Sequence, residues 1–337
     1  MQNLLDPAIL FFVFGVLAGA VRSNLEIPQA ISKFLSLYLL MALGLKGGFA
    51  LAKSGLSVEV LLSLLAAITM AFLVPAIGYF YLKNKTSRFD AAAIAASYGS
   101  VSAVTFVTAM QYLENLGMPF GGYMAVAMVI MESPAIIMAV LLANALRRTH
   151  SMVGVQSTAI AGKTDVASPT DASTISVGHI LRESFTDGAH LLLLGAMVVG
   201  WISGESGKAT MQPFSGDLFK GMLAFFLLDM GLLVARNFQS AKHTSSSLVA
   251  YAFAGPLLHA GLALALSVVL GLGAADAALL MVLSASASYI VVPAVLRYAI
   301  PEANPALYFG LSLGLTFPFN ILLGIPLYVE IAQVTLG

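Results

Sequence analysis

The chain has 337 residues, of which 59% are hydrophobic and only 9% are charged, and its formal net charge is zero. Soluble domains carry about 25% charged residues, so this composition excludes a soluble globular domain. It indicates an all-α membrane protein whose apolar surface faces a lipid bilayer. The balanced charge excludes strong attraction to nucleic acid, and the lack of cysteine excludes disulfides and thiolate metal sites.

Ten apolar segments are long enough to cross a bilayer at about 20 residues per span. They lie at residues 5–21, 34–50, 57–82, 90–113, 121–146, 188–204, 217–235, 245–270, 275–300 and 304–333. The N-terminal MQNLLD has no basic stretch, so a cleaved signal peptide is not expected. Residues 147–183 are rich in Ser, Thr, Ala and Gly and are expected to be a flexible linker. It would separate a first five-helix repeat, residues 1–146, from a second, residues 184–337.

The lysine and arginine residues predict the orientation, because cytoplasmic loops carry an excess of them. If both termini lie outside, only Lys46, Lys53, Lys208 and Lys220 are outside, and the other twelve of the 16 lie inside (16 − 4 = 12). The reverse orientation would invert this bias. We therefore expect the N- and C-termini outside and the linker in the cytoplasm.

The two halves of the chain resemble each other when Asp90 is aligned with Asp276. Ser100 then lies opposite Ser286 and Ser102 opposite Ser288, and further agreements follow in the same order, among them Pro134 with Pro318 after a small shift. Five spans are an odd number, so the two halves enter the membrane from opposite sides. This is the inverted repeat that secondary transporters use to alternate access.

The fourth and ninth spans each contain a small polar interruption, which predicts a broken helix. Glycine and clustered serines weaken a helix, and unwound backbone is tolerated at membrane depth where it lines a cavity. Helices that resume there direct free N–H groups at the centre and form an anion site without Lys or Arg. The predicted substrate-binding residues are Tyr98, Gly99, Ser100, Val101, Ser102, Ser284, Ala285, Ser286, Ala287 and Ser288. The alternative is that these small residues serve close helix packing.

A bound anion without a cationic side chain needs a counter-charge, and Na⁺ is the natural one. Glu132 lies in the middle of the fifth span, where a carboxylate is costly and marks an ion pathway by default. The alternative is a protonated Glu132 that is hydrogen-bonded to a neighbouring helix. Hard cations prefer oxygen ligands, so the predicted Na⁺ ligands are Ser102, Thr105, Glu132, Ser288, Thr316 and Asn320. No other cofactor and no catalytic residue is expected, because no hydrolase or metalloprotease motif occurs.

Some polar and small residues favour structural roles. Asp90 and Asp276 open helices, where a carboxylate caps free N–H groups. The pairs Gly15/Gly19 and Gly44/Gly48 have the spacing of close helix contacts, inside the chain or between subunits.

Three stretches resemble the SbtA-type family of cyanobacterial sodium-dependent bicarbonate symporters: SYGSVSAVTF (97–106), MESPAI (131–136) and SASASYIVVPAV (284–295). The resemblance covers essentially the whole chain. It implies a gate domain of spans 1, 2, 6 and 7, a core domain of spans 3–5 and 8–10, and a substrate pocket at the two interruptions. It also implies a homotrimer in the plasma membrane that takes up bicarbonate with Na⁺ for carbon concentration. A trimeric PII-like regulator would dock on its cytoplasmic face.

The expected function is therefore sodium-dependent bicarbonate symport, in which Na⁺ and HCO₃⁻ bind together between the broken spans. Two alternatives stay open at this point. One is a sodium-coupled carrier of another small anion or organic acid, and the other is an anion channel.

Overall fold

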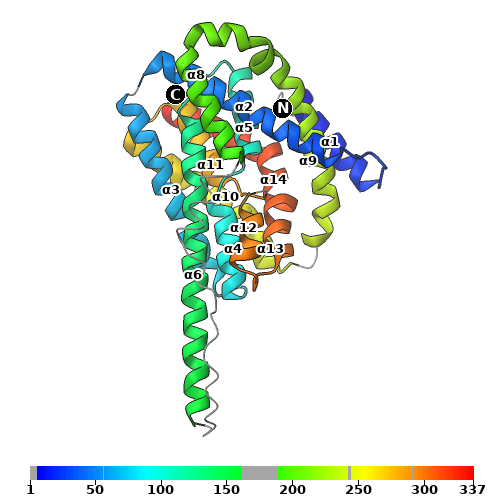
Figure 1. The fold of residues 1–337 in the computed structure, drawn as a ribbon, viewed down its shortest axis with the longest axis vertical. Helices are drawn as coiled ribbons and strands as arrows, with labels where there is room; N and C mark the ends of the chain where they lie inside the picture. The colour runs from blue at the N-terminus through cyan, green and yellow to red at the C-terminus, as the bar shows by residue number, and fades with distance from the viewer. Residues whose placement is uncertain (1–5, 56, 161–187, 242–243, 290) are drawn as a thin grey trace.

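The computed structural model describes residues 6–55, 57–160, 188–241, 244–289 and 291–337. Every regular element of this part is a helix (Figure 1). Residues 161–183 of the predicted linker lie outside the described residues.

Helices of the first half follow one another with short connections. They are α1 (Pro7–Ala20), α2 (Gln29–Ser54), α3 (Val58–Leu82), α4 (Arg88–Gly99), α5 (Ala103–Asn115) and α6 (Met124–Ile160). Polar side chains begin several of them: Asp6 accepts from the Ala8 N–H at 2.8 Å, and Ser87 accepts from the Asp90 N–H at 3.0 Å. Such caps satisfy N–H groups that have no partner within the helix.

Helices of the second half are α8 (Gly188–Met211), α9 (Leu218–Ala241), α10 (Ser246–Leu270), α11 (Ala274–Ala285), α12 (Val291–Ala299), α13 (Pro305–Leu311), α14 (Phe317–Phe319) and α15 (Ile325–Leu336). A π-helical turn, Gln212–Asp217, joins α8 to α9, and two more, Ser312–Thr316 and Asn320–Gly324, flank α14. Pro318 lies in α14 and has no N–H to donate, so the usual ladder of bonds is interrupted there.

Seven helical segments of the described part are long and apolar enough to cross a membrane, which confirms the expectation of a helical membrane protein. One of them, Leu191–Phe238, has 48 residues and covers the sixth and seventh predicted spans. Two shorter apolar helices, Pro7–Ala20 and Ala274–Ala285, fall on predicted spans 1 and 9. Ten spans arranged as an inverted repeat stay a prediction.

The helices pack as two sets. The first set, termed the four-helix group, consists of α1, α2, α8 and α9. Within it α2 packs closely with α8, and α1 packs closely with α9. The large group contains α3–α6 and α10–α15, whose closest contacts are mostly with one another. The predicted glycine contacts lie inside the chain: a Cβ added to Gly15 would be 3.1 Å from the Cα of Gly231, and one added to Gly48 would be 2.9 Å from the Cα of Gly200.

The predicted linker is helical where it begins. Helix α6 continues past Arg147 to Ile160, and Figure 1 shows it projecting far beyond the other helices. The sequence between these residues contains no proline and a single glycine, Gly154, so the helix meets no strong breaker. Polar composition alone was therefore a poor guide to where the fifth helix ends.

The roles predicted for Asp90 and Asp276 need correction. Ser87 caps α4, whereas the Asp90 carboxylate accepts from the Ser87 hydroxyl at 2.7 Å and from the Asn304 N–H at 2.7 Å, just before α13. Asp276 likewise accepts from the Gly121 N–H at 2.7 Å, just before α6, and from the Tyr123 hydroxyl. Each carboxylate thus ties the start of its helix to the segment that leads into the last predicted span of the other half, span 10 for Asp90 and span 5 for Asp276. The predicted structural role holds, but the partner is distant in sequence.

Candidate functional site

Both predicted interruptions are breaks between two helices. Helix α4 ends at Gly99, Ser100 and Ser102 have extended backbones (φ −91°, ψ 174° and φ −102°, ψ 108°), and α5 starts at Ala103. In the second half α11 ends at Ala285, Ser286 is extended (φ −82°, ψ 165°), and α12 starts at Val291. The prediction that these spans are broken is therefore confirmed.

The breaks begin later than predicted, because Tyr98, Gly99, Ser284 and Ala285 are still helical. Gly99 serves close packing instead: a Cβ added there would lie 2.5 Å from the Cβ of Pro75 on α3. A glycine that admits a neighbouring helix need not end its own.

The two breaks contact each other directly. The Ser102 N–H donates to the Ser286 Oγ at 2.9 Å, and the Ser288 N–H donates to the Ser97 carbonyl at 2.7 Å. Unwound backbone at membrane depth must be satisfied from within the protein, and here Ser286 of the second break and the Ser97 carbonyl at the end of α4 each accept from an N–H group of the opposite break. The two non-helical stretches therefore lie side by side.

A serine stands at the start of each helix that follows a break. The Ser102 Oγ accepts from the Thr105 N–H at 3.2 Å and from the Thr105 hydroxyl at 2.9 Å, and the Ser288 Oγ accepts from the Val292 N–H at 3.4 Å. The N-terminal ends of α5 and α12 carry partial positive charge and N–H groups without helical partners. Two positive helix ends consequently meet at the crossing.

A cavity of about 70 Å³ lies at this crossing. Its wall is formed by both breaks together with α2, α6 and α8, through Ser36, Leu40, Val101, Ser102, Ala103, Val104, Met128, Glu132, Ala189, Leu193, Ser288 and Tyr289. One water occupies about 30 Å³ of liquid, so the cavity suits a small ion or oxyanion. None of these lining residues is Lys, Arg or His, which leaves helix ends as the source of positive potential.

Among the predicted site residues, Val101, Ser102, Glu132 and Ser288 line this cavity. Thr105 lies directly behind it, bonded to Ser102. Glu132 is buried, with 7% of its surface exposed, and brings a carboxylate to the same space as the two helix ends. The described residues contain no group of three or more His, Cys, Asp or Glu side chains that could hold a metal ion. A cation here would depend on Glu132 and neutral oxygens.

Other predicted residues lie elsewhere. The hydroxyl of Tyr98 bonds to Thr316 Oγ1 at 2.6 Å, and Thr316 donates to the Ala252 carbonyl at 2.7 Å. Asn320 donates to the carbonyl of Ala285 at 2.8 Å and accepts from the Tyr328 hydroxyl at 3.1 Å. Thr316 and Asn320 therefore do not line the cavity, and their polar groups already have protein partners. Their proposed role as Na⁺ ligands stays a prediction that this geometry does not favour.

Sequence reasoning missed the contribution of Ser36 and Tyr289 to the cavity wall. Ser36 lies in the first third of α2, in a mixed polar and apolar stretch that also includes Ser32 and Tyr38, so nothing in the sequence singled it out. Tyr289 follows the last serine of the second break, and its ring packs against Phe317 with a centroid distance of 5.1 Å. Only the fold shows that both face the same space as Glu132.

Comparison with known families gives one result for nearly the whole chain. A family model described as the Na⁺-dependent bicarbonate transporter superfamily matches residues 7–333. No curated protein matches the chain.

Proposed function

Since the chain belongs to the Na⁺-dependent bicarbonate transporter superfamily, and is a sodium-dependent bicarbonate transporter rather than an enzyme, we propose that it works as a high-affinity symporter by alternating access. The observation that carries this proposal is the cavity at the crossing. Two positive helix ends and the carboxylate of Glu132 share about 70 Å³ of buried space. That combination suits one small anion and one small cation side by side.

In this proposal HCO₃⁻ binds the N-terminal ends of α5 and α12, where Ser102 and Ser288 offer hydroxyl groups. Na⁺ binds next to Glu132, and each ion lowers the electrostatic cost of placing the other in a low-dielectric site. The helix ends supply the positive potential without a fixed cation that would hold the anion too firmly. Coupling then arises because neither ion is stable there alone.

The proposed architecture is ten transmembrane helices in a 5+5 inverted repeat, residues 1–146 and 184–337, around a cytoplasmic linker, residues 147–183. Matching contacts support it: Asp90 and Asp276, aligned in sequence, each bind the segment that leads into the last predicted span of the opposite half. The mutual bonds of the two breaks support it as well. The four-helix group would be the gate domain, and the large group would be the core domain that moves against it.

The remaining parts of the proposal concern cell biology. The charge bias favours outside N- and C-termini. The resemblance to cyanobacterial symporters supports a homotrimer in the plasma membrane that serves a carbon-concentrating mechanism. It also supports a trimeric PII-like regulator on the cytoplasmic face.

We expect one Na⁺ per HCO₃⁻, so that the loaded carrier moves no net charge. A membrane potential, worth about 2.3 kcal/mol per charge per 100 mV, would then contribute nothing net, and the Na⁺ gradient would drive uptake. Recording from proteoliposomes checks this, because a substantial substrate-dependent current contradicts a 1:1 ratio.

The central test is uptake of labelled bicarbonate into proteoliposomes at graded Na⁺ concentrations. Ser102→Ala and Ser288→Ala should each lower uptake at least tenfold, since each removes a hydroxyl from the cavity wall. Glu132→Gln should raise the Na⁺ concentration needed for half-maximal uptake. Ser267→Ala is the matched control, because the hydroxyl of this buried serine on α10 donates to the Ala263 carbonyl of its own helix, and this variant should transport normally.

Folded Ser102→Ala and Ser288→Ala proteins that transport like wild type would remove the site from the proposal. Strong competition by acetate or nitrate would favour a carrier of another small anion. Flux that neither saturates nor requires Na⁺ would favour a channel.

A further inference from the structure

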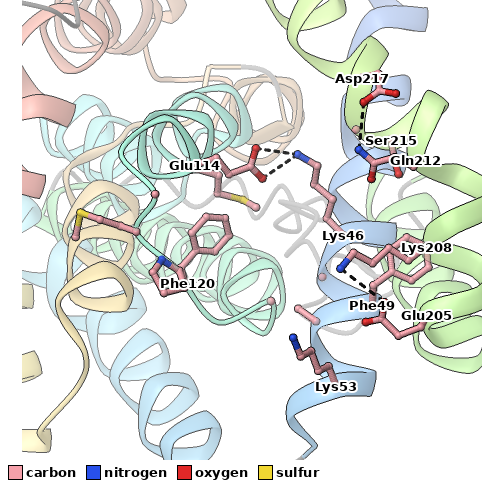
Figure 2. A pocket seen from close by; sticks show the side chains of 18 of the residues that line it. Lys46, Phe49, Lys53, Glu114, Phe120, Glu205, Lys208, Gln212, Ser215 and Asp217 are labelled. Carbon is pink, nitrogen blue, oxygen red and sulfur yellow. Dashed lines mark hydrogen bonds and ion pairs between the residues drawn. The ribbon is translucent and has the colours of Figure 1, made fainter.

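The C-terminal end of α5 is bound by three helices of the four-helix group. Lys46 on α2 contacts both carboxylate oxygens of Glu114, at 2.9 and 3.1 Å (Figure 2). Asn115 donates to Asp6, which precedes α1, at 3.0 Å and accepts from Lys220 on α9 at 3.0 Å. These five residues, Asp6, Lys46, Glu114, Asn115 and Lys220, are termed the polar clasp.

Backbone packing at the same place brings the two groups of helices into close contact. A Cβ added to Gly122, in the segment before α6, would lie 2.6 Å from the carbonyl oxygen of Gly47 on α2. Gly47 directly follows Lys46 of the polar clasp. The two groups therefore touch backbone to backbone beside the ion pair, and any separation at this end must break both contacts.

A cavity of about 870 Å³ adjoins the polar clasp, and its charges are unevenly divided. All four lining lysines, Lys46, Lys53, Lys208 and Lys220, belong to the four-helix group. Glu114 is the single charged residue that the large group contributes among the described lining residues. A second ion pair at this cavity, Lys208 with Glu205 at 3.8 Å, lies entirely within α8 (Figure 2).

This division shows which contact responds to relative movement. When the two groups separate, Lys208 and Glu205 stay together, whereas Lys46 and Glu114 are pulled apart. Exposed ion pairs and polar contacts are weak, each favouring the paired state by roughly two- to fivefold. Several of them in parallel can bias a conformational equilibrium and still be broken in every transport cycle.

We propose that Glu114 and Asn115 are positioning residues of transport: through the polar clasp they hold the large group against the four-helix group at this end. The inference rests on the proposed alternating access, because the clasp matters only if the two groups move apart. Its release opens the path from the 870 Å³ cavity toward the crossing. Its formation closes that path.

The test measures the separation of the two groups directly. The chain has no cysteine, so Lys53→Cys and Met118→Cys place one spin label on each side of the cavity. In this background Lys46→Gln and Glu114→Gln should each raise the population with the longer distance at least twofold. The swapped pair, Lys46→Glu with Glu114→Lys, should restore the wild-type distribution. Lys208→Gln should leave it unchanged.

Two further measurements guard against misfolded variants. Raising the salt concentration to about 1 M screens exposed charges and should shift the distribution of the labelled, otherwise unaltered protein in the same direction. When bicarbonate is supplied on the side of the 870 Å³ cavity, the KM of Lys46→Gln should be lower than that of the wild type. The decrease should be at most the factor by which the open population rises. A purely structural ion pair would change thermal stability without this selective change in KM.

Distributions unaffected by Lys46→Gln, by Glu114→Gln and by salt would overturn the inference. That failure is separate from failure of the proposed function. If the unaltered protein takes up labelled bicarbonate with Na⁺ while distances stay fixed, only the clasp is wrong. If distances respond but no bicarbonate enters, the clasp survives and the transport proposal is wrong.

Discussion

Ser100 and Ser286 are aligned in sequence and stand at the start of the two helix breaks, but their hydroxyl groups differ in their hydrogen bonds. Ser286 donates to the Leu283 carbonyl at 2.8 Å and accepts from the Ser102 N–H at 2.9 Å. The hydroxyl of Ser100 is buried and has no hydrogen-bond partner among the described residues. The second break therefore supplies the side chain that joins both breaks. Similar sequence at aligned positions does not imply equal structural importance.

The helix ends around the breaks are also supported differently. In the first half the start of α5 is held, because Ser102 caps it locally. In the second half the end of α11 is held, because Asn320 from a π-helical turn donates to the Ala285 carbonyl. The second break thus has a local serine cap, Ser288, like the first, and in addition the helix that precedes it is held by Asn320 from another span.

The largest expected effect comes from Ser286→Ala, which leaves the Ser102 N–H buried without its partner. An unsatisfied buried donor costs about 1–3 kcal/mol, so the free energy of unfolding should fall by that amount, and bicarbonate uptake should drop at least tenfold. Ser100→Ala is the matched control and should leave the free energy of unfolding within about 0.5 kcal/mol of wild type. Thermal unfolding in detergent and uptake assays measure both. Equal losses in the two variants would contradict the asymmetry.

A smaller effect is expected for Asn320→Ala, which removes the donor to Ala285 and the acceptor for the Tyr328 hydroxyl. The loss should be about 1–2 kcal/mol of stability, together with reduced uptake, because the end of α11 is no longer held. Asn237→Ala is the control, since this amide bonds to the Leu233 carbonyl of its own helix. If Asn237→Ala is as harmful as Asn320→Ala, the bond across spans has no special role.

The smallest effect concerns the far end of α12. Arg147 donates to the Ala299 carbonyl at 2.9 Å and to both Glu302 carboxylate oxygens at 2.7 Å. The hydrogen bond from Arg147 holds the pKa of Glu302 below its ordinary value. The ion pair therefore stabilises the folded protein fully at pH values above the ordinary pKa of a glutamate. This stabilisation is lost as the pH falls through the lowered pKa of Glu302.

Glu302→Gln should cost roughly 0.5–1 kcal/mol at neutral pH, because the pair is partly exposed. The difference from wild type should shrink in acid. Unfolding midpoints measured at pH 7 and pH 4 give this comparison. A difference that grows in acid would show that Glu302 is stabilised in its protonated form.

The sequence predicted the breaks because glycine and clustered serines act locally on helix stability. It also pointed to Ser102, Glu132 and Ser288, which do share a cavity. Partners set by the crossing of distant spans were not predictable in this way. Asp90 binds Asn304, and Thr316 is used by Tyr98 and Ala252. No periodicity or spacing encodes such pairings, since they depend on how two halves of the chain face each other.

The helices that follow the two breaks are attached to different parts of the molecule. Figure 1 shows α5 toward the end where α8 lies and α12 toward the end from which α6 projects. The far end of α5 is bound to the four-helix group, whereas the far end of α12 is bound to α6 of its own group. If the binding site is open to one side of the membrane in only a fraction of the molecules, a ligand on that side binds with an apparent affinity reduced by that fraction. The half-saturation concentration of the ligand should therefore differ between the two sides of the membrane. Import and export would then differ in their kinetics although the overall transport equilibrium is the same.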